Sequence, residues 1–200
     1  MEKIILASCS PRRRELLNIA GIPFDIFAPD VDESCTLPAE LAVAEISARK
    51  AHAAGSLYPG RFILSADTLV TIDGKKLGKP ADRRDAERML RLLSGRTHQV
   101  WTGVSLLTPS GDFYTETDRS DVTFCPVPED EIISYVLSGE PMDKAGAYAL
   151  QGYASLWITR MEGSCSSVIG LPMHRVRELL LRGGYSFASS APKPEIPRKG

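Results

Sequence analysis

The stretch KIILASCSPRRRELLNIAG, residues 3–21, encodes a strand, a short polar loop and a helix. The apolar side chains of residues 4–7 predict a short strand over residues 3–7. Ser10 is a favourable helix N-cap residue, Pro11 suits the first helical position, and Gly21 suits a helix end. A strand that leads directly into a helix is typical of the start of an α/β fold.

The remainder of the chain continues to alternate between strands and helices. Hydrophobic period and turn residues predict strands over residues 24–28, 61–66, 100–107, 113–124 and 155–161, a hairpin over 70–77, and helices over 38–55, 82–95, 129–137 and 173–181. The dipeptide Asp73-Gly74 is a strong signal for a tight hairpin turn. Because hairpins interrupt the alternation, we expect an α/β protein with a mixed sheet.

Length and composition indicate one soluble domain. The chain has 200 residues, of which 43% are hydrophobic and 24% are charged, and its formal net charge is -1. This is an ordinary globular composition, and we place a single domain at residues 1–185. The segment 186–200 is rich in Pro, Ser, Ala and Lys, so we expect a disordered tail there.

The sequence favours a cytoplasmic protein without a membrane or a stable nucleic-acid partner. A balanced charge does not suit a protein that coats nucleic acid, because such a protein needs an excess of basic residues. The four cysteines are far apart in sequence, which does not suit a disulfide scaffold or a zinc knuckle. The N-terminal apolar run is too short for a signal peptide, and no window approaches the roughly 20 apolar residues of a membrane span.

The segment from Ser8 to Arg13 has the chemistry of a phosphate site. Arg12 and Arg13 fall in the first turn of the predicted helix, where cations oppose the helix dipole. Free backbone N–H groups, the hydroxyls of Ser8 and Ser10, and the two guanidinium groups would converge on an anion there. A solvated basic helix start is the alternative that this segment alone leaves open.

Acidic residues follow two of the predicted strands. Asp30, Asp32 and Glu33 come after one strand, and Asp67 ends the strand predicted at residues 61–66. Carboxylates at the rim of a sheet serve as ligands of Mg²⁺ or Mn²⁺ or as general bases. An aspartate at the end of a strand is also common in ordinary turns, so its position alone leaves both interpretations open.

Further polar residues give weaker indications of a binding role. Lys50 lies late in a predicted helix, and Lys79 lies between Gly78 and Pro80, where a fixed cation suits a phosphate but a solvated lysine is equally compatible. Gln151 lies near the end of a glycine-rich loop at residues 139–152, and its amide could read the edge of a nucleobase. The three histidines have no metal-ligand spacing, so we expect them to be surface or packing residues.

Eight short stretches, in order, resemble the Maf family of septum-formation-associated nucleoside triphosphate pyrophosphatases. They are LASCSPRR at 6–13, VDES at 31–34, RKA at 49–51, SADTLV at 65–70, LGKP at 77–80, LSGRTHQVWTGV at 93–104, EPMDKAGAYALQG at 140–152 and VIGLP at 168–172. Each stretch is weak by itself, but the eight together in this order and spacing are highly specific. The resemblance covers nearly the whole chain.

The resemblance implies a fold, a cofactor and roles for particular residues. The fold would be an elongated mixed β-sheet flanked by helices, with two lobes and a central cleft, similar to inosine triphosphate pyrophosphatases. The protein would be a homodimer that uses a divalent cation such as Mg²⁺, Mn²⁺ or Co²⁺. Asp67 would accept the proton of the attacking water, Glu33 and Asp67 would hold the metal, and the triphosphate would be surrounded by Ser8, Arg12, Arg13, Lys50 and Lys79.

The resemblance also implies a substrate class. Arg12, Thr68 and Gln151 match the specificity positions of the branch of the family that hydrolyses dTTP and UTP to the monophosphate and pyrophosphate. Two alternatives remain at this point. One is a 7-methyl-GTP pyrophosphatase of the same family, and the other is a nucleotide-binding regulator of cell division without catalysis.

Overall fold

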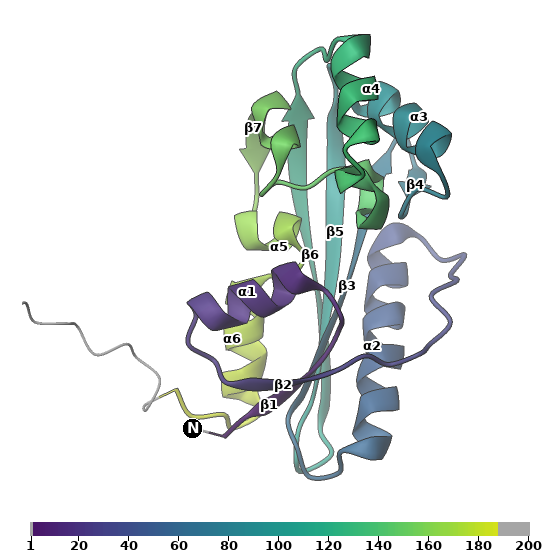
Figure 1. Cartoon of the computed structure of the whole chain (residues 1–200). Coiled ribbons are helices and arrows are strands. Elements are labelled where there is room, and N and C mark those ends of the chain that lie inside the picture. The colour runs from purple at the N-terminus through teal and green to yellow at the C-terminus, as the bar shows by residue number, and fades with distance from the viewer. Residues whose placement is uncertain (1, 188–200) are drawn as a thin grey trace, which may run out of the picture.

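A computed structural model describes residues 2–187 of the chain. From residue 188 onward, the predicted disordered tail lies outside the described residues. Within the described part, a seven-stranded sheet runs along the long axis of an elongated molecule (Figure 1). The strands are β1 (Ile4–Ala7), β2 (Phe24–Phe27), β3 (Ile63–Ile72), β4 (Lys75–Leu77), β5 (Thr97–Leu107), β6 (Phe113–Phe124) and β7 (Ile158–Glu162).

The sheet is mixed, as the interrupted alternation predicts. Its strand order is β2-β1-β3-β5-β6-β7, with β4 beside β3. Strand β1 is parallel to both β2 and β3, whereas the other pairs are antiparallel. The apolar run of β1 is buried on both faces, which explains its lack of alternation.

Helices cover the sheet and divide the molecule into two lobes (Figure 1). They are α1 (Pro11–Ile19), α2 (Ala39–Leu57), α3 (Arg83–Leu93), α4 (Glu129–Leu137), α5 (Cys165–Ile169) and α6 (Met173–Arg182). In one lobe, α2 packs on one face of the sheet, and α1 and α6 pack on the other. In the second lobe, α3 and α4 pack against the end of β3, the start of β5 and the end of β6. The fold expected from the family resemblance is confirmed.

Several element boundaries differ from the sequence predictions. The most important correction concerns β3. This strand does not end at Asp67 but continues through it to Ile72. The strand predicted at 155–161 begins as the 3₁₀ turn Tyr153–Trp157 and becomes β7 only at Ile158. The glycine-rich loop contains the 3₁₀ turns Glu140–Asp143 and Ala145–Ala147. The short helix α5 was not predicted, because five residues are too few for a periodic pattern.

Helix α2 approaches the sheet unusually closely because the residues between them are small. A methyl group added at Gly103 of β5 would overlap the backbone carbonyl of Val43 in α2. One turn further along, Ser47 bonds the hydroxyl of Ser105 at 2.8 Å, and its carbonyl accepts a hydrogen bond from Ser65 at 2.6 Å. Asp67 pairs with Gly103 across the β3–β5 ladder, so this close packing lies beside the aspartate.

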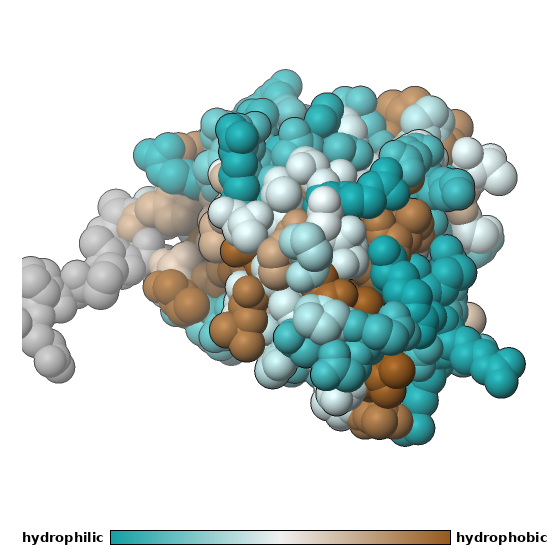
Figure 2. Space-filling model, turned by 90° about the horizontal axis from the view of Figure 1, so that it is seen from above, coloured by the Kyte–Doolittle hydropathy of each residue, from teal (hydrophilic) through white to brown (hydrophobic). Residues whose placement is uncertain are grey.

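The surface is predominantly polar, and its exposed apolar residues are dispersed. Figure 2 shows one end of the molecule, where hydrophobic residues form separate patches between hydrophilic ones. The most exposed large hydrophobic side chains are those of Ile19, Leu57, Leu137 and Leu156. No helix within residues 2–187 combines the length and the apolarity that crossing a membrane requires.

The close packing at Gly103 leads to a testable prediction. The substitution Gly103→Ala should lower the free energy of unfolding by about 1–3 kcal/mol, because α2 must shift away from the sheet to admit the methyl group. Urea denaturation followed by circular dichroism measures this change. An unfolding midpoint equal to that of the wild type would mean that the helix does not depend on this close approach.

Candidate functional site

A notch in one edge of β3 creates the main cavity of the protein. Strand β5 pairs with the first edge of β3 continuously from Ile63 to Thr71. On the second edge, β1 pairs only with Ile63 and Leu64, and β4 pairs only with residues 70–72. The edge of residues 65–69 is therefore free, and a cavity of about 660 Å³ opens there between the lobes.

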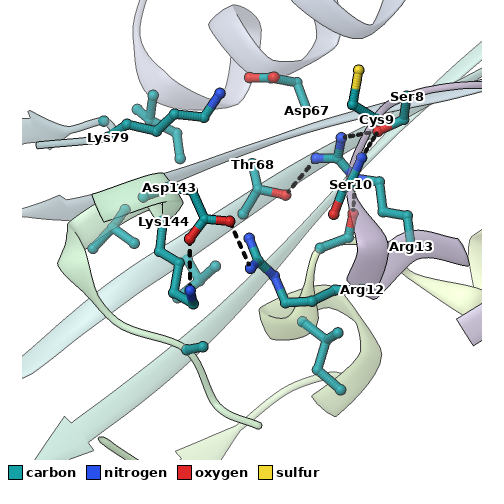
Figure 3. A pocket seen from close by; sticks show the side chains of 18 of the residues that line it. Ser8, Cys9, Ser10, Arg12, Arg13, Asp67, Thr68, Lys79, Asp143 and Lys144 are labelled. Atoms are coloured by element: carbon teal, nitrogen blue, oxygen red, sulfur yellow. Dashed lines mark hydrogen bonds and ion pairs between the residues drawn. The ribbon is translucent and has the colours of Figure 1, made fainter. Parts of the chain in front are cut away.

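All ten site residues predicted from the sequence line this one cavity. They are Ser8, Ser10, Arg12, Arg13, Glu33, Lys50, Asp67, Thr68, Lys79 and Gln151. They come from the loop after β1, the start of α1, the loop before α2, α2 itself, β3, the loop after β4, and the loop before β7. The close-up in Figure 3 shows Arg12, Arg13, Asp67 and Lys79 around the same space.

A buried lysine joins the two candidate metal ligands. The alternation of β3 directs Asp67 towards α2, where Lys50 Nζ lies 2.7 Å from its carboxylate. The same Nζ lies 2.7 Å from a carboxylate oxygen of Glu33. The side chains of Lys50 and Asp67 are 9% and 12% exposed, whereas that of Glu33 is 50% exposed. One ammonium group therefore holds together two carboxylates from different elements.

The charges around Glu33 keep it ionised. Partial burial raises the pKa of Glu33, but the hydrogen bond from Lys50 and the positive charges of Lys50, Lys79 and Arg13 outweigh that effect. The net pKa of Glu33 lies below its ordinary value. A deprotonated carboxylate is the form that binds a hard cation.

Arg13 is a buried cation without a carboxylate partner. Its guanidinium donates hydrogen bonds to Gly170 O at 2.7 Å, Ser8 Oγ at 2.9 Å and Thr68 Oγ1 at 3.2 Å (Figure 3). All three acceptors are neutral, and no carboxylate of the described residues forms a salt bridge with it. Burial lowers the pKa of Arg13, although the negative charge of Asp67 opposes this shift. An unpaired buried charge that borders a cavity is suited to an anionic ligand.

The serines beside Arg13 serve the loop in different ways. Ser8 is buried and accepts hydrogen bonds from Arg13 and, at 3.2 Å, from the backbone nitrogen of Ser10. Ser10 occupies the N-cap position of α1, but its side chain makes no capping hydrogen bond. Ser10 therefore stands at the predicted N-cap position, but without the side-chain hydrogen bond of a capping serine.

Arg12, at the start of α1, also lines the cavity and faces an acidic residue. Its Nη1 is 3.6 Å from Oδ2 of Asp143, and the other carboxylate oxygen of Asp143, Oδ1, accepts a hydrogen bond from Lys144 at 2.6 Å (Figure 3). The loop that carries Asp143 and Lys144 is fixed to the β4 side of the cavity, since Gly146 N donates to Gly78 O at 3.0 Å. Arg12 of one lobe and Lys144 of the other thus share a single carboxylate.

The predicted specificity residues lie at separate points of the cavity. Thr68 is directed to the face opposite Asp67, where its hydroxyl accepts a hydrogen bond from the guanidinium of Arg13 and shares one with the hydroxyl of Thr102. Gln151 lies at the exposed rim, and its amide nitrogen donates to Glu15 of α1 at 3.3 Å. Both side chains border the space that a ligand would occupy, which is compatible with the expected recognition of a base.

Three further residues line the cavity that are not among the site residues predicted from the sequence. They are Asp143, Lys144 and Tyr148. The sequence feature that could have indicated these three residues is the stretch DKAGAY at 143–148, in which small residues permit close approach of the backbone. The hydroxyl of Tyr148 bonds the buried His98 Nε2 at 2.7 Å, which fixes the ring at the cavity wall.

The donor set fits a magnesium-like cation. Glu33 and Asp67 provide hard carboxylate oxygens, and Mg²⁺ in nucleotide sites is commonly held by one or two carboxylates, substrate phosphates and water. Among residues 2–187, no group of three or more His, Cys, Asp and Glu side chains could hold a metal by itself. The histidines are packing or surface residues as predicted: His98 is buried, and His52 stacks on Phe113.

Comparisons with known proteins agree on one family and one activity. A family model described as Maf-like protein matches residues 3–182. A dTTP/UTP pyrophosphatase of Symbiobacterium thermophilum is 48% identical in an alignment of 188 residues that covers 92% of this chain and 96% of the relative. A dTTP/UTP pyrophosphatase of Bacillus anthracis is 44% identical in an alignment of 183 residues that covers 90% of this chain and 95% of the relative.

The similarity to solved structures concerns the fold alone. The structure of a HAM1 protein from Coxiella burnetii aligns with a TM-score of 0.51 and 18% identity. The alignment covers 91% of this chain and all of that one. An elongated mixed sheet with helices on its faces is therefore shared with proteins of very different sequence.

The shared carboxylate of Asp143 leads to a second prediction. Asp143→Asn should raise the affinity for inorganic triphosphate by roughly two- to fivefold, because Arg12 and Lys144 lose an anion that competes with the ligand. Titration calorimetry at constant ionic strength measures the affinity. Asp112→Asn, in the distant β5–β6 turn, makes the same change of net charge and should have little effect. Equal affinities in all three proteins would mean that Asp143 does not compete with the anion.

Proposed function

The chain belongs to the Maf-like protein family, and on that premise we propose that it is a nucleoside triphosphate pyrophosphatase acting on dTTP and UTP. It would release the nucleoside monophosphate and pyrophosphate. The substrate pair follows from the curated relatives, which carry that activity in their names at 44% to 48% identity over most of their length. The chemistry of the cavity gives an independent argument for the same reaction class.

The arrangement of charges in the notch carries this proposal. The cavity combines two carboxylates on Lys50 with a buried guanidinium that lacks a carboxylate partner. Arg12 and Lys79 add positive charge at its walls. A polyphosphate needs cations along its length, and a hydrolase also needs a carboxylate beside the attacked phosphorus. A binding protein would need the cations but would have no use for a buried Asp67 in mid-strand.

In the proposed reaction, water attacks the α-phosphorus of the nucleotide. Asp67 accepts a proton as the water oxygen forms its bond to phosphorus. The bond between the α-phosphorus and its bridging oxygen breaks, and that oxygen leaves with the β- and γ-phosphates as pyrophosphate. Arg13, Lys50 and Lys79 offset the negative charge that spreads over the phosphate oxygens in the transition state.

A divalent cation is part of the proposal, with Glu33 and Asp67 as its protein ligands. When bound, such a cation supplies positive charge that polarises the phosphoryl group and helps orient the water. Mg²⁺, Mn²⁺ and Co²⁺ all suit oxygen donors of this kind. Lys50 holds the two carboxylates close to each other.

The base of the substrate would lie against the walls that carry Thr68 and Gln151. The amide of Gln151 has a donor and an acceptor that match the edge of a pyrimidine. The threonine is fixed from both sides by Arg13 and Thr102, so it offers a preformed contact. Together with Arg12, these side chains would distinguish dTTP and UTP from 7-methyl-GTP.

The proposal extends to the assembly and the compartment. We expect a homodimer, as the family resemblance implies, and a cytoplasmic enzyme without a stable nucleic-acid partner. Four cysteines that are free of disulfides accord with a reducing compartment. Sedimentation analysis of the purified chain tests the dimer.

The reaction and substrate are tested by identifying products. Purified protein is incubated with Mg²⁺ or Mn²⁺ and, separately, dTTP, UTP, CTP, ATP, GTP and 7-methyl-GTP, and the products are separated by ion-exchange chromatography. We expect monophosphate and pyrophosphate, with the highest rates for dTTP and UTP. Activity on 7-methyl-GTP alone would contradict the substrate assignment, and diphosphate with orthophosphate would contradict attack at the α-phosphorus.

The role of Asp67 is tested by Asp67→Asn. The amide keeps the shape of the side chain and can still accept a hydrogen bond from Lys50, but it cannot take the proton of water. We expect kcat to fall by about 10²–10⁴-fold while the affinity for a non-hydrolysable dTTP analogue remains measurable. Full activity in this variant would exclude the general-base role. Tight nucleotide binding without turnover in the wild type would favour the non-catalytic regulator.

A further inference from the structure

Glu33 reaches the cavity from a segment without regular secondary structure. The chain between Phe27, the last residue of β2, and Ala39, the first of α2, contains neither helix nor strand. The side chain of Glu33 is half exposed, so packing contributes little to its position. A ligand on such a loop would lose conformational entropy each time it bound a cation, unless the loop were fixed in advance.

Arg49 fixes the backbone on both sides of Glu33. Its Nη1 donates to the carbonyl oxygens of Asp32 and Ser34, at 3.1 Å each. These carbonyls belong to the residues immediately before and after Glu33. The next residue of α2, Lys50, holds the carboxylate of Glu33 itself. Two successive residues of one helix therefore hold the backbone and the side chain of the same glutamate.

The guanidinium of Arg49 is itself oriented by its own helix. Its Nε donates to Glu45 Oε1, one turn earlier, at 2.9 Å. Glu45 makes no hydrogen bond or ion pair with the loop among the described residues. Of the ion pair Glu45–Arg49, only Arg49 therefore contacts the loop.

Two further contacts give the loop its shape. The carboxylate of Asp32 accepts hydrogen bonds from the backbone nitrogen and the hydroxyl of Ser34, at 2.8 Å each, as in an Asx turn around Glu33. Lys76 of β4 donates to the carbonyls of Cys35 at 2.7 Å and Leu37 at 2.9 Å. The segment is therefore held from α2 on one side and from β4 on the other.

We propose that Arg49 is a positioning residue that preorganises Glu33 for the divalent cation by holding the carbonyls on either side of it. This inference rests on the proposed function, because it takes Glu33 to be a metal ligand. It assigns to Arg49 a role distinct from that of Lys50, which contacts the carboxylates directly. Groups that orient a metal ligand commonly change metal affinity or activity by about 10- to 100-fold when they are removed.

The test compares Arg49→Met with Glu45→Gln. Both variants remove the Glu45–Arg49 ion pair, but only the methionine removes the hydrogen bonds to the loop. Hydrogen exchange measured by mass spectrometry on residues 29–38 reports the order of the loop without any metal. We expect faster exchange of this segment in Arg49→Met and exchange like that of the wild type in Glu45→Gln.

Binding of Mn²⁺ to the free protein provides the second measurement. Calorimetry or electron paramagnetic resonance should show about tenfold weaker affinity in Arg49→Met and less than a twofold change in Glu45→Gln. In a double-mutant cycle with Glu33→Gln, the further substitution of Arg49 should leave the residual affinity unchanged, because Arg49 acts through Glu33. A purely structural role would instead give the same loss in both backgrounds.

The outcomes separate this inference from the proposed function. If the wild type hydrolyses dTTP but Arg49→Met matches Glu45→Gln in exchange and in Mn²⁺ affinity, the positioning role is overturned and the enzyme assignment stands. If the wild type hydrolyses no nucleotide, the proposed function fails, and exchange together with Mn²⁺ binding still decides the role of Arg49. An additive cycle would also overturn the inference.

Discussion

The ammonium group of Lys50 between Asp67 and Glu33 is the interaction on which the architecture of the site depends. Its nitrogen lies 2.7 Å from an oxygen of each carboxylate. Removing one member of a buried ion pair typically costs about 3–5 kcal/mol, because the partner is left charged and unsolvated. Each of Lys50 and Asp67 therefore depends on the opposite charge of the other, and α2 has to lie close enough to the sheet for the two side chains to form the ion pair.

That proximity depends on small side chains that take no part in the proposed chemistry. Gly103 admits the backbone of α2, and Ser47 joins the helix to two strands through short hydrogen bonds. The same strand that presents Asp67 to the helix presents Thr68 to the opposite face, where Arg13 binds it. The pleat of one strand thus connects the two carboxylates on one side with the unpaired guanidinium on the other.

The gap in the sheet edge turns these contacts into a cavity. Strand β1 stops after four residues, and β4 pairs only further along β3. The loop after β1 leaves the sheet at this point and brings Ser8, Arg12 and Arg13 to the opening. Because the second lobe supplies Lys79, Lys144 and Gln151, a ligand in the notch would contact both lobes at once. This geometry suits a long, multiply charged molecule such as a nucleoside triphosphate.

The order of the strands and helices was accessible from the sequence because it depends on local signals. The strand-loop-helix at residues 3–21 and the hairpin turn at Asp73-Gly74 arise from residues that are adjacent in the chain, and both are observed. The residue types of the candidate site were also accessible, since clustered cations and carboxylates stand out in sequence. Their convergence was inferred through the family resemblance, and all ten predicted residues do line one cavity.

Pairings between distant segments were decided only by the tertiary structure. The sequence predicts a strand over residues 61–66 with Asp67 at its end, whereas β3 continues past Asp67, and the cation that faces this carboxylate, Lys50, lies 17 residues away in the chain. No role is predicted from the sequence for Asp143 or Arg49, since their partners, Arg12 and the carbonyls around Glu33, are remote in sequence. The sequence by itself determined which elements form and which charges are available. The tertiary structure decided which charges meet, because electrostatic pairing depends on distance in space and not on separation along the chain.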